Sequence, residues 1–187
     1  MRGPQRHDAF EERTHWYFFC FSAKSGALQE PAQKSLMPVS YSFQSFFSLS
    51  VEELYAILAL RSEVFIVEQN CPYQDLDGKD SNSIHILGLD DVGNLVSYCR
   101  LLPPDLAYPG YSSIGRVITS MAVRGSGEGK KLMEYAIREI KTLFPAADVK
   151  ISAQCYALPF YEALGFVAIG DVYLEDDIPH QAMVLKA

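Results

Sequence analysis

A short polar segment of the chain holds three glycines within five residues, Gly125, Gly127 and Gly129, with Arg124 before them and Lys130 after them. Glycine has no side chain, so the backbone can approach a ligand closely. The unpaired N–H groups of a helix's first turn favour an anion. Because backbone amides and two cations would converge at a helix start here, the segment predicts a site for an anionic group such as phosphate.

The flanking sequence predicts a strand before this turn and a helix after it. Upstream, β-branched and other apolar residues suit a mostly buried strand, at Val117, Ile118, Met121 and Val123. Downstream, apolar residues recur at helical spacing, so one stripe must face a core, at positions 132, 133, 136, 137, 140, 143 and 144. Pro145 then ends the helix. A tight strand-to-helix connection without a ligand is the alternative interpretation.

Two common phosphate-binding patterns do not fit this turn. The P-loop requires Ser or Thr after its lysine, whereas Lys130 is followed by Lys131. A dinucleotide fingerprint needs a third glycine, and Leu132 stands in that place. The spacing that remains is Arg124, two residues, Gly127, one residue and Gly129. It resembles the loop that binds the pyrophosphate of coenzyme A in GNAT acetyltransferases, whose pattern is Arg or Gln, two residues, Gly, one residue, and Gly or Ala.

From about Leu54 onward the chain is similar to the ElaA family of GNAT proteins over about 130 residues in collinear order. The stretches that carry the resemblance are Leu60-Arg61, residues 64–75, Asp77-Gly78, residues 85–88, residues 115–118, Phe160-Tyr161, Gly165-Phe166 and residues 178–180. The resemblance implies an N-acetyltransferase that uses acetyl-CoA as cosubstrate, attacks the thioester directly with an amine and needs no metal. A longer acyl donor and a coenzyme-binding module without turnover are the alternatives.

The resemblance also assigns the coenzyme site. Backbone groups of the loop would hold the pyrophosphate, and the strand before it would splay from its parallel neighbour to receive the pantetheine arm near Met121 and Val123. The cofactor-binding residues expected in this way are Met121, Ala122, Val123, Arg124, Gly125, Ser126, Gly127, Glu128, Gly129, Lys130 and Tyr161. Tyr161 is the expected proton donor, because a phenol with a pKa of about 10 suits a departing thiolate. The alternative is that Tyr161 only packs, with its hydroxyl bonded to the backbone.

The proton acceptor is expected near the first helix. Glu68 and His85 are the candidate catalytic bases, although a lone histidine is more often structural. The acyl-homoserine-lactone synthases share the GNAT fold, and a partial likeness to them adds a further set of residues. The expected substrate-binding residues from this likeness are Arg61, Phe65, Asp75 and Asp77. His180 is added to them, and like His85 it lies beside a strand-like segment and could also act as a base. Arg100 belongs to the same likeness, but the tryptophan expected there is absent, and Asp75 and Asp77 equally suit turn chemistry.

Composition limits the class of protein. The 187 residues suffice for one domain with a core, and 49% of them are hydrophobic. No apolar run reaches the roughly 18 residues of a membrane span. The net charge of −7 argues against nucleic acid as a partner and is compatible with a small-molecule or peptide amine. Paired spacing is absent from the four cysteines, Cys20, Cys71, Cys99 and Cys155, which indicates reduced thiols in a cytoplasmic protein. The protein is expected to be a monomer or a homodimer.

The remaining pattern predicts an α/β (α+β) fold with a mixed sheet, preceded by an extension over residues 1–36 that carries an aromatic run from Trp16 to Phe21. The domain would span 37–187. Ser50 and Glu53 have capping-box spacing, which predicts a helix over 51–67. The expected elements after it are a loop at 69–83, a hairpin of strands 84–89 and 95–102, a strand at 149–153, a helix at 157–163 and strands at 166–173 and 180–186.

Overall fold

A computed structural model describes residues 38–187, and the predictions for residues 1–36, including the aromatic run and Cys20, lie outside the described residues. The first sheet has four strands in the order β1-β2-β3-β4, and all neighbours are antiparallel. Its strands are β1 (Ser40–Ser45), β2 (Ile84–Leu89), β3 (Leu95–Leu102) and β4 (Ser113–Thr119). The predicted hairpin of β2 and β3 is confirmed with the same bounds. Strand β1 was not predicted, because its serine-rich sequence has a weak apolar pattern.

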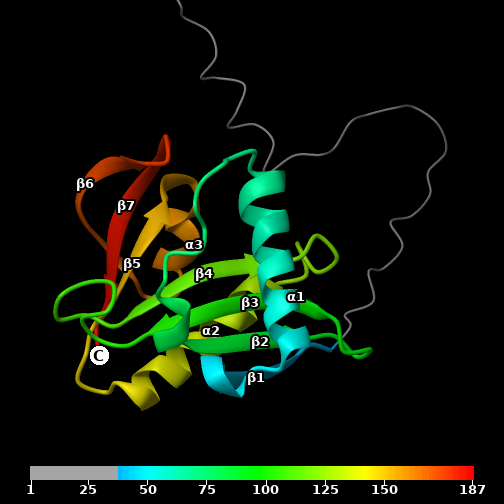
Figure 1. The fold of residues 1–187 in the computed structure, drawn as a ribbon. Coiled ribbons are helices and arrows are strands. Elements are labelled where there is room, and N and C mark those ends of the chain that lie inside the picture. Colours follow the sequence, from blue (N-terminus) through cyan, green and yellow to red (C-terminus); the bar gives the residue numbers. More distant parts are fainter. Residues whose placement is uncertain (1–37) are drawn as a thin grey trace, which may run out of the picture. The chain divides into compact units, whose positions relative to one another are not determined.

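The second sheet has three strands in the order β5-β7-β6, formed by β5 (Val149–Gln154), β6 (Val167–Glu175) and β7 (Ile178–Leu185). It meets the first sheet at one end of β4 and β5. There the Ser112 amide donates to the Asp148 carbonyl at 3.1 Å, and the Lys150 amide donates to the Ser112 carbonyl at 2.9 Å. Beyond this parallel bridge the two strands are not paired. The splay expected from the family resemblance is therefore present (Figure 1).

Helices cover both faces of the first sheet, with α1 (Val51–Arg61) on one face and α2 (Glu128–Leu143) on the other (Figure 1). Consecutive strand residues point to opposite faces. Ile86 and Cys99 accordingly pack in the core on the α2 side, whereas Leu87 and Tyr98 pack with Ile57 of α1. The predicted α2 stripe supplies the first core with four fully buried residues, Leu132, Met133, Ala136 and Ile140. Helix α2 ends before Pro145, as predicted.

The capping box at the start of α1 is confirmed. The Glu53 amide donates to Ser50 Oγ at 3.1 Å, and the Ser50 amide donates to Glu53 Oε2 at 2.8 Å. The single helix predicted over 51–67 is formed by two consecutive segments. Helix α1 ends at Arg61, and a π-helical segment follows over Ser62–Glu68. Single π turns within helices often occur at functional sites.

The strand predicted before the glycine-rich turn ends earlier than expected. Strand β4 stops at Thr119, and residues 121–127 form turns in which Met121 is exposed. The expectation that Met121 and Val123 belong to the splayed strand is therefore wrong. The apolar pattern predicted a strand here, but the backbone amides of this segment form local turn hydrogen bonds instead. Val123 N donates to the Ser120 carbonyl, and Ser126 N donates to the Val123 carbonyl. Helix α3 (Leu158–Glu162) lies close to its predicted place.

Candidate active site

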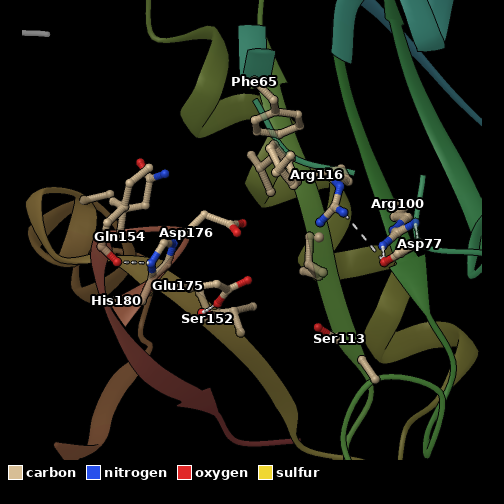
Figure 2. A pocket seen from close by; sticks show the side chains of 18 of the residues that line it. Phe65, Asp77, Arg100, Ser113, Arg116, Ser152, Gln154, Glu175, Asp176 and His180 are labelled. Atoms are coloured by element: carbon tan, nitrogen blue, oxygen red, sulfur yellow. Dashed lines mark hydrogen bonds and ion pairs between the residues drawn. The ribbon is translucent and has the colours of Figure 1, made fainter. Parts of the chain in front are cut away.

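A cavity of about 710 Å³ lies between the diverging strands β4 and β5. Figure 2 shows its two walls. One wall carries Phe65, Asp77, Arg100, Ser113 and Arg116, and the other carries Ser152, Gln154, Glu175, Asp176 and His180. The main-chain pairing that would close this space is missing beyond the Ser112 bridge. A narrow arm of a ligand can therefore lie between the strands and pair with their backbone groups.

The glycine-rich loop leads from the end of β4 into α2. Gly125 and Gly127 have φ angles of 77° and 83°, and Gly127 is the residue that caps the helix. These are left-handed conformations that favour glycine. A Cβ built on either glycine would meet no atom within 4 Å, so the backbone is open to the outside at both positions. The geometry fits the predicted anion site, with first-turn amides of α2 available to a phosphate.

The side chains of this loop are already engaged. Arg124 Nη1 lies 2.6 Å from Glu68 Oε2, and Arg124 Nε donates to the Thr119 carbonyl at 2.9 Å. Lys130 is exposed and pairs with Glu134 at 3.7 Å. The Glu68 carboxylate therefore faces the loop, and it is not among the side chains that line the cavity. This position does not favour Glu68 as the base.

Glu128 turns away from the loop surface. Its side chain is buried, accepts a hydrogen bond from the Tyr41 hydroxyl and accepts another from Ser97 Oγ at 3.0 Å. The carboxylate thus anchors the start of α2 to strands β1 and β3. Glu128 can serve a bound anion only through its backbone amide.

Tyr161 of α3 lines the cavity. Its ring packs edge-on against Phe160 and Phe166, with ring centroids 5.0 and 5.9 Å away. Burial raises the pKa of Tyr161 above its ordinary value, so the phenol keeps its proton at neutral pH. Within residues 38–187 its hydroxyl forms no hydrogen bond, in contrast to the backbone-bonded packing considered from the sequence. The position is compatible with the expected proton donor.

His85 lies in the core rather than on the cavity wall. It is fully buried, its Nδ1 is 2.8 Å from the Tyr98 hydroxyl and its Nε2 is 3.0 Å from the Asp80 carbonyl oxygen. Burial lowers the pKa of His85 below its ordinary value. Because both ring nitrogens are occupied, this placement favours a structural histidine over a base.

The predicted substrate residues Arg61, Asp75 and Asp77 form a buried ion-pair network with Asp80 and two further arginines. Arg61 reaches Asp75 and Asp80, each at 2.8 Å. Arg100 joins Asp77 to Asp80, with 2.7 Å to Asp80, and Arg116 binds Asp75 at 2.6 Å. Burial opposes ionisation of Asp77 and Asp80, but hydrogen bonds from Arg100 hold the pKa of both carboxyls below the usual range.

Only part of this network faces the cavity. Asp77, Arg100 and Arg116 line it, whereas Arg61 and Asp75 do not. Turn chemistry explains a minor part, since Asp77 Oδ1 accepts from the Lys79 amide at 3.1 Å. Arg61 and Asp75 therefore hold the wall in place behind the side chains that a substrate would meet.

The remaining predicted substrate residues, Phe65 and His180, both line the cavity. Phe65 projects from the π-helical segment, and His180 of β7 stacks on Tyr173 with its Nδ1 2.8 Å from the Ile178 carbonyl. Sequence reasoning missed the carboxylate beside them. Glu175 Oε2 accepts from Ser152 Oγ at 2.8 Å on the cavity wall. Its only sequence signal was the acidic run over 175–177.

Residues 38–187 contain no group of three or more His, Cys, Asp or Glu side chains that could hold a metal ion. None of their helices is long and apolar enough to cross a membrane. Cys71, Cys99 and Cys155 are free thiols.

Comparison with known proteins decides the family. A family model described as the acetyltransferase (GNAT) domain matches residues 50–187. Protein ElaA of Escherichia coli is 44% identical over 137 residues, which cover 72% of this chain and 88% of ElaA. The chain belongs to the ElaA family of GNAT acetyltransferases.

Solved structures of the family agree with this assignment. The crystal structure of Escherichia coli ElaA aligns with a TM-score of 0.74 at 40% identity, covering 80% of this chain and all of that one. An acyl-CoA N-acyltransferase from Pseudomonas aeruginosa aligns with the same TM-score at 43% identity, covering 79% of this chain and 99% of that one. A CoA-dependent acyl-homoserine lactone synthase, at 19% identity and a TM-score of 0.63, shares the fold alone.

Proposed function

We propose that this ElaA-family protein is a cytoplasmic N-acetyltransferase that transfers the acetyl group of acetyl-CoA to a primary amine by direct attack. The observation that carries the proposal is the opening between β4 and β5. The open glycine loop follows one of these strands, and Tyr161 lies on the cavity wall beyond the other. The relative from Pseudomonas aeruginosa, which is called an acyl-CoA N-acyltransferase, supports the same class of donor.

The residues of the loop fit coenzyme A. Backbone amides at the start of α2 and the guanidinium of Arg124 would hold the pyrophosphate, for which Arg124 would exchange its partner Glu68. Bound there, the coenzyme supplies an activated acetyl thioester. Free backbone groups of β4 would bind the arm that carries it, because β4 has no partner on this side beyond the bridge at Ser112.

Within the cavity, side chains of the protein would accept one proton from the substrate and donate another to the leaving group. The amine must lose a proton to become a nucleophile, and the carboxylates of Glu175 and Asp176 on the cavity wall would receive it. As the nitrogen bonds to the acetyl carbon, the carbon–sulfur bond breaks and Tyr161 gives its proton to the sulfur. The raised pKa of Tyr161 keeps that proton available at neutral pH.

Replacing Tyr161 with Phe tests the assignment. The hydroxyl makes no hydrogen bond within residues 38–187, so the variant should fold normally and bind acetyl-CoA with unchanged affinity. The turnover number should fall about 100-fold or more, because a positioned general acid contributes factors of this size. Phe160→Leu, a change at a neighbouring ring, is the matched control. Undiminished acetyl transfer by Tyr161→Phe would remove Tyr161 from the mechanism.

A further inference from the structure

Arg116 has an unusual backbone conformation for a strand residue. Tyr98 pairs with Ile118 and Arg100 pairs with Gly115, so Cys99 of β3 faces two residues of β4, Arg116 and Val117. This is a β-bulge, and Arg116 has a φ of 55° within it. Left-handed φ is uncommon for non-glycine residues in a strand, and bulges near active sites redirect a side chain. The bulge turns Arg116 into the cavity.

The guanidinium of Arg116 is held in a defined orientation. Nε binds Asp75 Oδ1 at 2.6 Å, and Nη2 donates to the Asp75 carbonyl at 2.8 Å. The aromatic rings of Phe65 and Tyr73 also lie near the guanidinium, each with its centroid 5.9 Å from Arg116 Cζ. Nη1 has no hydrogen-bond partner within the described part of the chain. Because the group is 22% exposed and lines the cavity, it can still bind a ligand.

A second unmet donor lies on the same wall. Arg100 Nε is buried and has no hydrogen-bond partner among residues 38–187, and the Arg100 side chain, which lines the cavity, is 3% exposed. Buried N–H groups are nearly always paired, so an unpaired one is a signal. Gly115 leaves space beside it, since a Cβ there would stand 3.8 Å from Arg100 Nε.

The two walls of the cavity carry opposite charge. On the Arg116 side, four cations contact three aspartates, which leaves this network net positive. The members of the network that line the cavity are Asp77, Lys79, Arg100 and Arg116. On the opposite side, Glu175 and Asp176 form no ion pair with the described residues. Figure 2 shows Asp176 and Arg116 facing one another across the cavity.

We infer that the amine acceptor also carries a carboxylate, so that the substrate class is an amino acid. Its carboxylate binds Arg116, with Arg100 adding charge behind it, and its amine faces Glu175 and Asp176. Arg116 Nη2 also lies 3.7 Å from Asp77 Oδ2, but Nη1 has no partner among the described residues, so Nη1 can donate to a carboxylate that the guanidinium charge attracts. The inference rests on the proposed acetyl transfer and specifies its acceptor. A simple amine or polyamine would leave the positively charged wall without an anionic partner.

Matched pairs of acceptors test the inference on the full-length protein. Each pair is an amino acid and the amine obtained by removing its carboxylate, such as lysine with 1,5-diaminopentane and phenylalanine with 2-phenylethylamine. Release of the coenzyme thiol and the mass of the acetylated product are measured together. We expect kcat/KM to be about 10- to 100-fold higher for the amino acid of an accepted pair, the size of a hydrogen-bonded charge pair.

Variants of Arg116 locate the effect. Arg116→Gln should remove the preference by lowering kcat/KM for the amino acid about 10- to 100-fold, chiefly through KM, with little change for the plain amine. Arg116→Lys should restore part of it, because charge remains but the planar fork is lost. Acetyl-CoA affinity should stay unchanged. Arg138→Gln, at an exposed arginine of α2 outside the cavity, is the control.

The possible results distinguish a failure of the amino-acid acceptor from a failure of the proposed acetyl transfer. Acetyl transfer with equal kcat/KM for both members of every accepted pair overturns the amino-acid acceptor and leaves the acetyltransferase intact. Transfer to no amine of either kind overturns both. The comparison of acceptor pairs on the unaltered protein decides the question even if the Arg116 variants fail to fold.

Discussion

Alanine at the loop glycines should separate coenzyme binding from stability. Gly127 has a φ of 83° and a Cβ there would touch nothing within 4 Å, so the cost of alanine is backbone strain without a clash. A left-handed alanine costs about 1–2 kcal/mol. For a domain of this size, that lowers the unfolding midpoint by about 2–8 °C. Gly110 has a φ of 77° and equally open surroundings, so Gly110→Ala should lose as much stability.

Only Gly127→Ala should weaken acetyl-CoA binding. At Gly129 the new methyl would lie 4.0 Å from Thr119 Cγ2 and φ is ordinary, so Gly129→Ala should be neutral or up to about 1 kcal/mol more stable, and the loop pattern that the chain resembles allows alanine there. The methyl at Gly127 would displace a phosphate from the helix amides. Loss of one such hydrogen bond to a charged group weakens binding about 10- to 100-fold.

Calorimetric titration of acetyl-CoA and thermal unfolding of the four proteins complete the experiment. We expect affinity to fall in Gly127→Ala and to remain at the wild-type value in Gly129→Ala and Gly110→Ala. Stability should fall in Gly127→Ala and Gly110→Ala only. Wild-type affinity in Gly127→Ala would refute the assignment of the loop, and Gly110→Ala controls for the loss of stability.

Three further changes probe the surroundings of the site. Asp80→Asn should destabilise the protein by about 3–5 kcal/mol in urea unfolding, since it removes the carboxylate shared by the buried Arg61 and Arg100 and leaves each with one aspartate; a loss below 1 kcal/mol would show that the network tolerates it. His85 takes up a proton more readily when unfolded, so stability should decline as pH falls below the unfolded pKa of about 6.5, and His85→Gln should flatten that slope; an identical slope in the variant would exclude His85 as its source. Glu68→Gln should tighten acetyl-CoA binding a few-fold by releasing Arg124, with turnover within tenfold of wild type; a loss of about 100-fold or more would instead restore Glu68 as the base.

The sequence predicted those parts of the fold that depend on local pattern. The stripe of α2 and the hairpin of β2 and β3 have clear periodicity, and their predicted positions are confirmed. Strand β1 lacks such a pattern, because its place depends on pairing with β2 from Ser40 to Ser45. The apolar residues at 121 and 123 extended the predicted β4 too far, since local turn bonds override strand propensity there.

The candidate site shows the same division. The glycine loop could be predicted because its chemistry depends on consecutive residues. The roles of Asp75 and Asp77 could not, because an aspartate in a turn and one paired with a distant arginine look alike in sequence. Arg116 carried no local signal either, since its conformation results from a bulge against β3. Long-range pairing therefore determines the wall that a substrate would meet.

The most direct test of the central claim is calorimetric titration of acetyl-CoA into the full-length protein, with desulfo-CoA as the comparison ligand. The account predicts saturable binding of one acetyl-CoA per chain in the micromolar range, with desulfo-CoA binding similarly because the pyrophosphate loop holds both. Absence of binding at millimolar acetyl-CoA would contradict the assignment of the loop and of the cavity between β4 and β5.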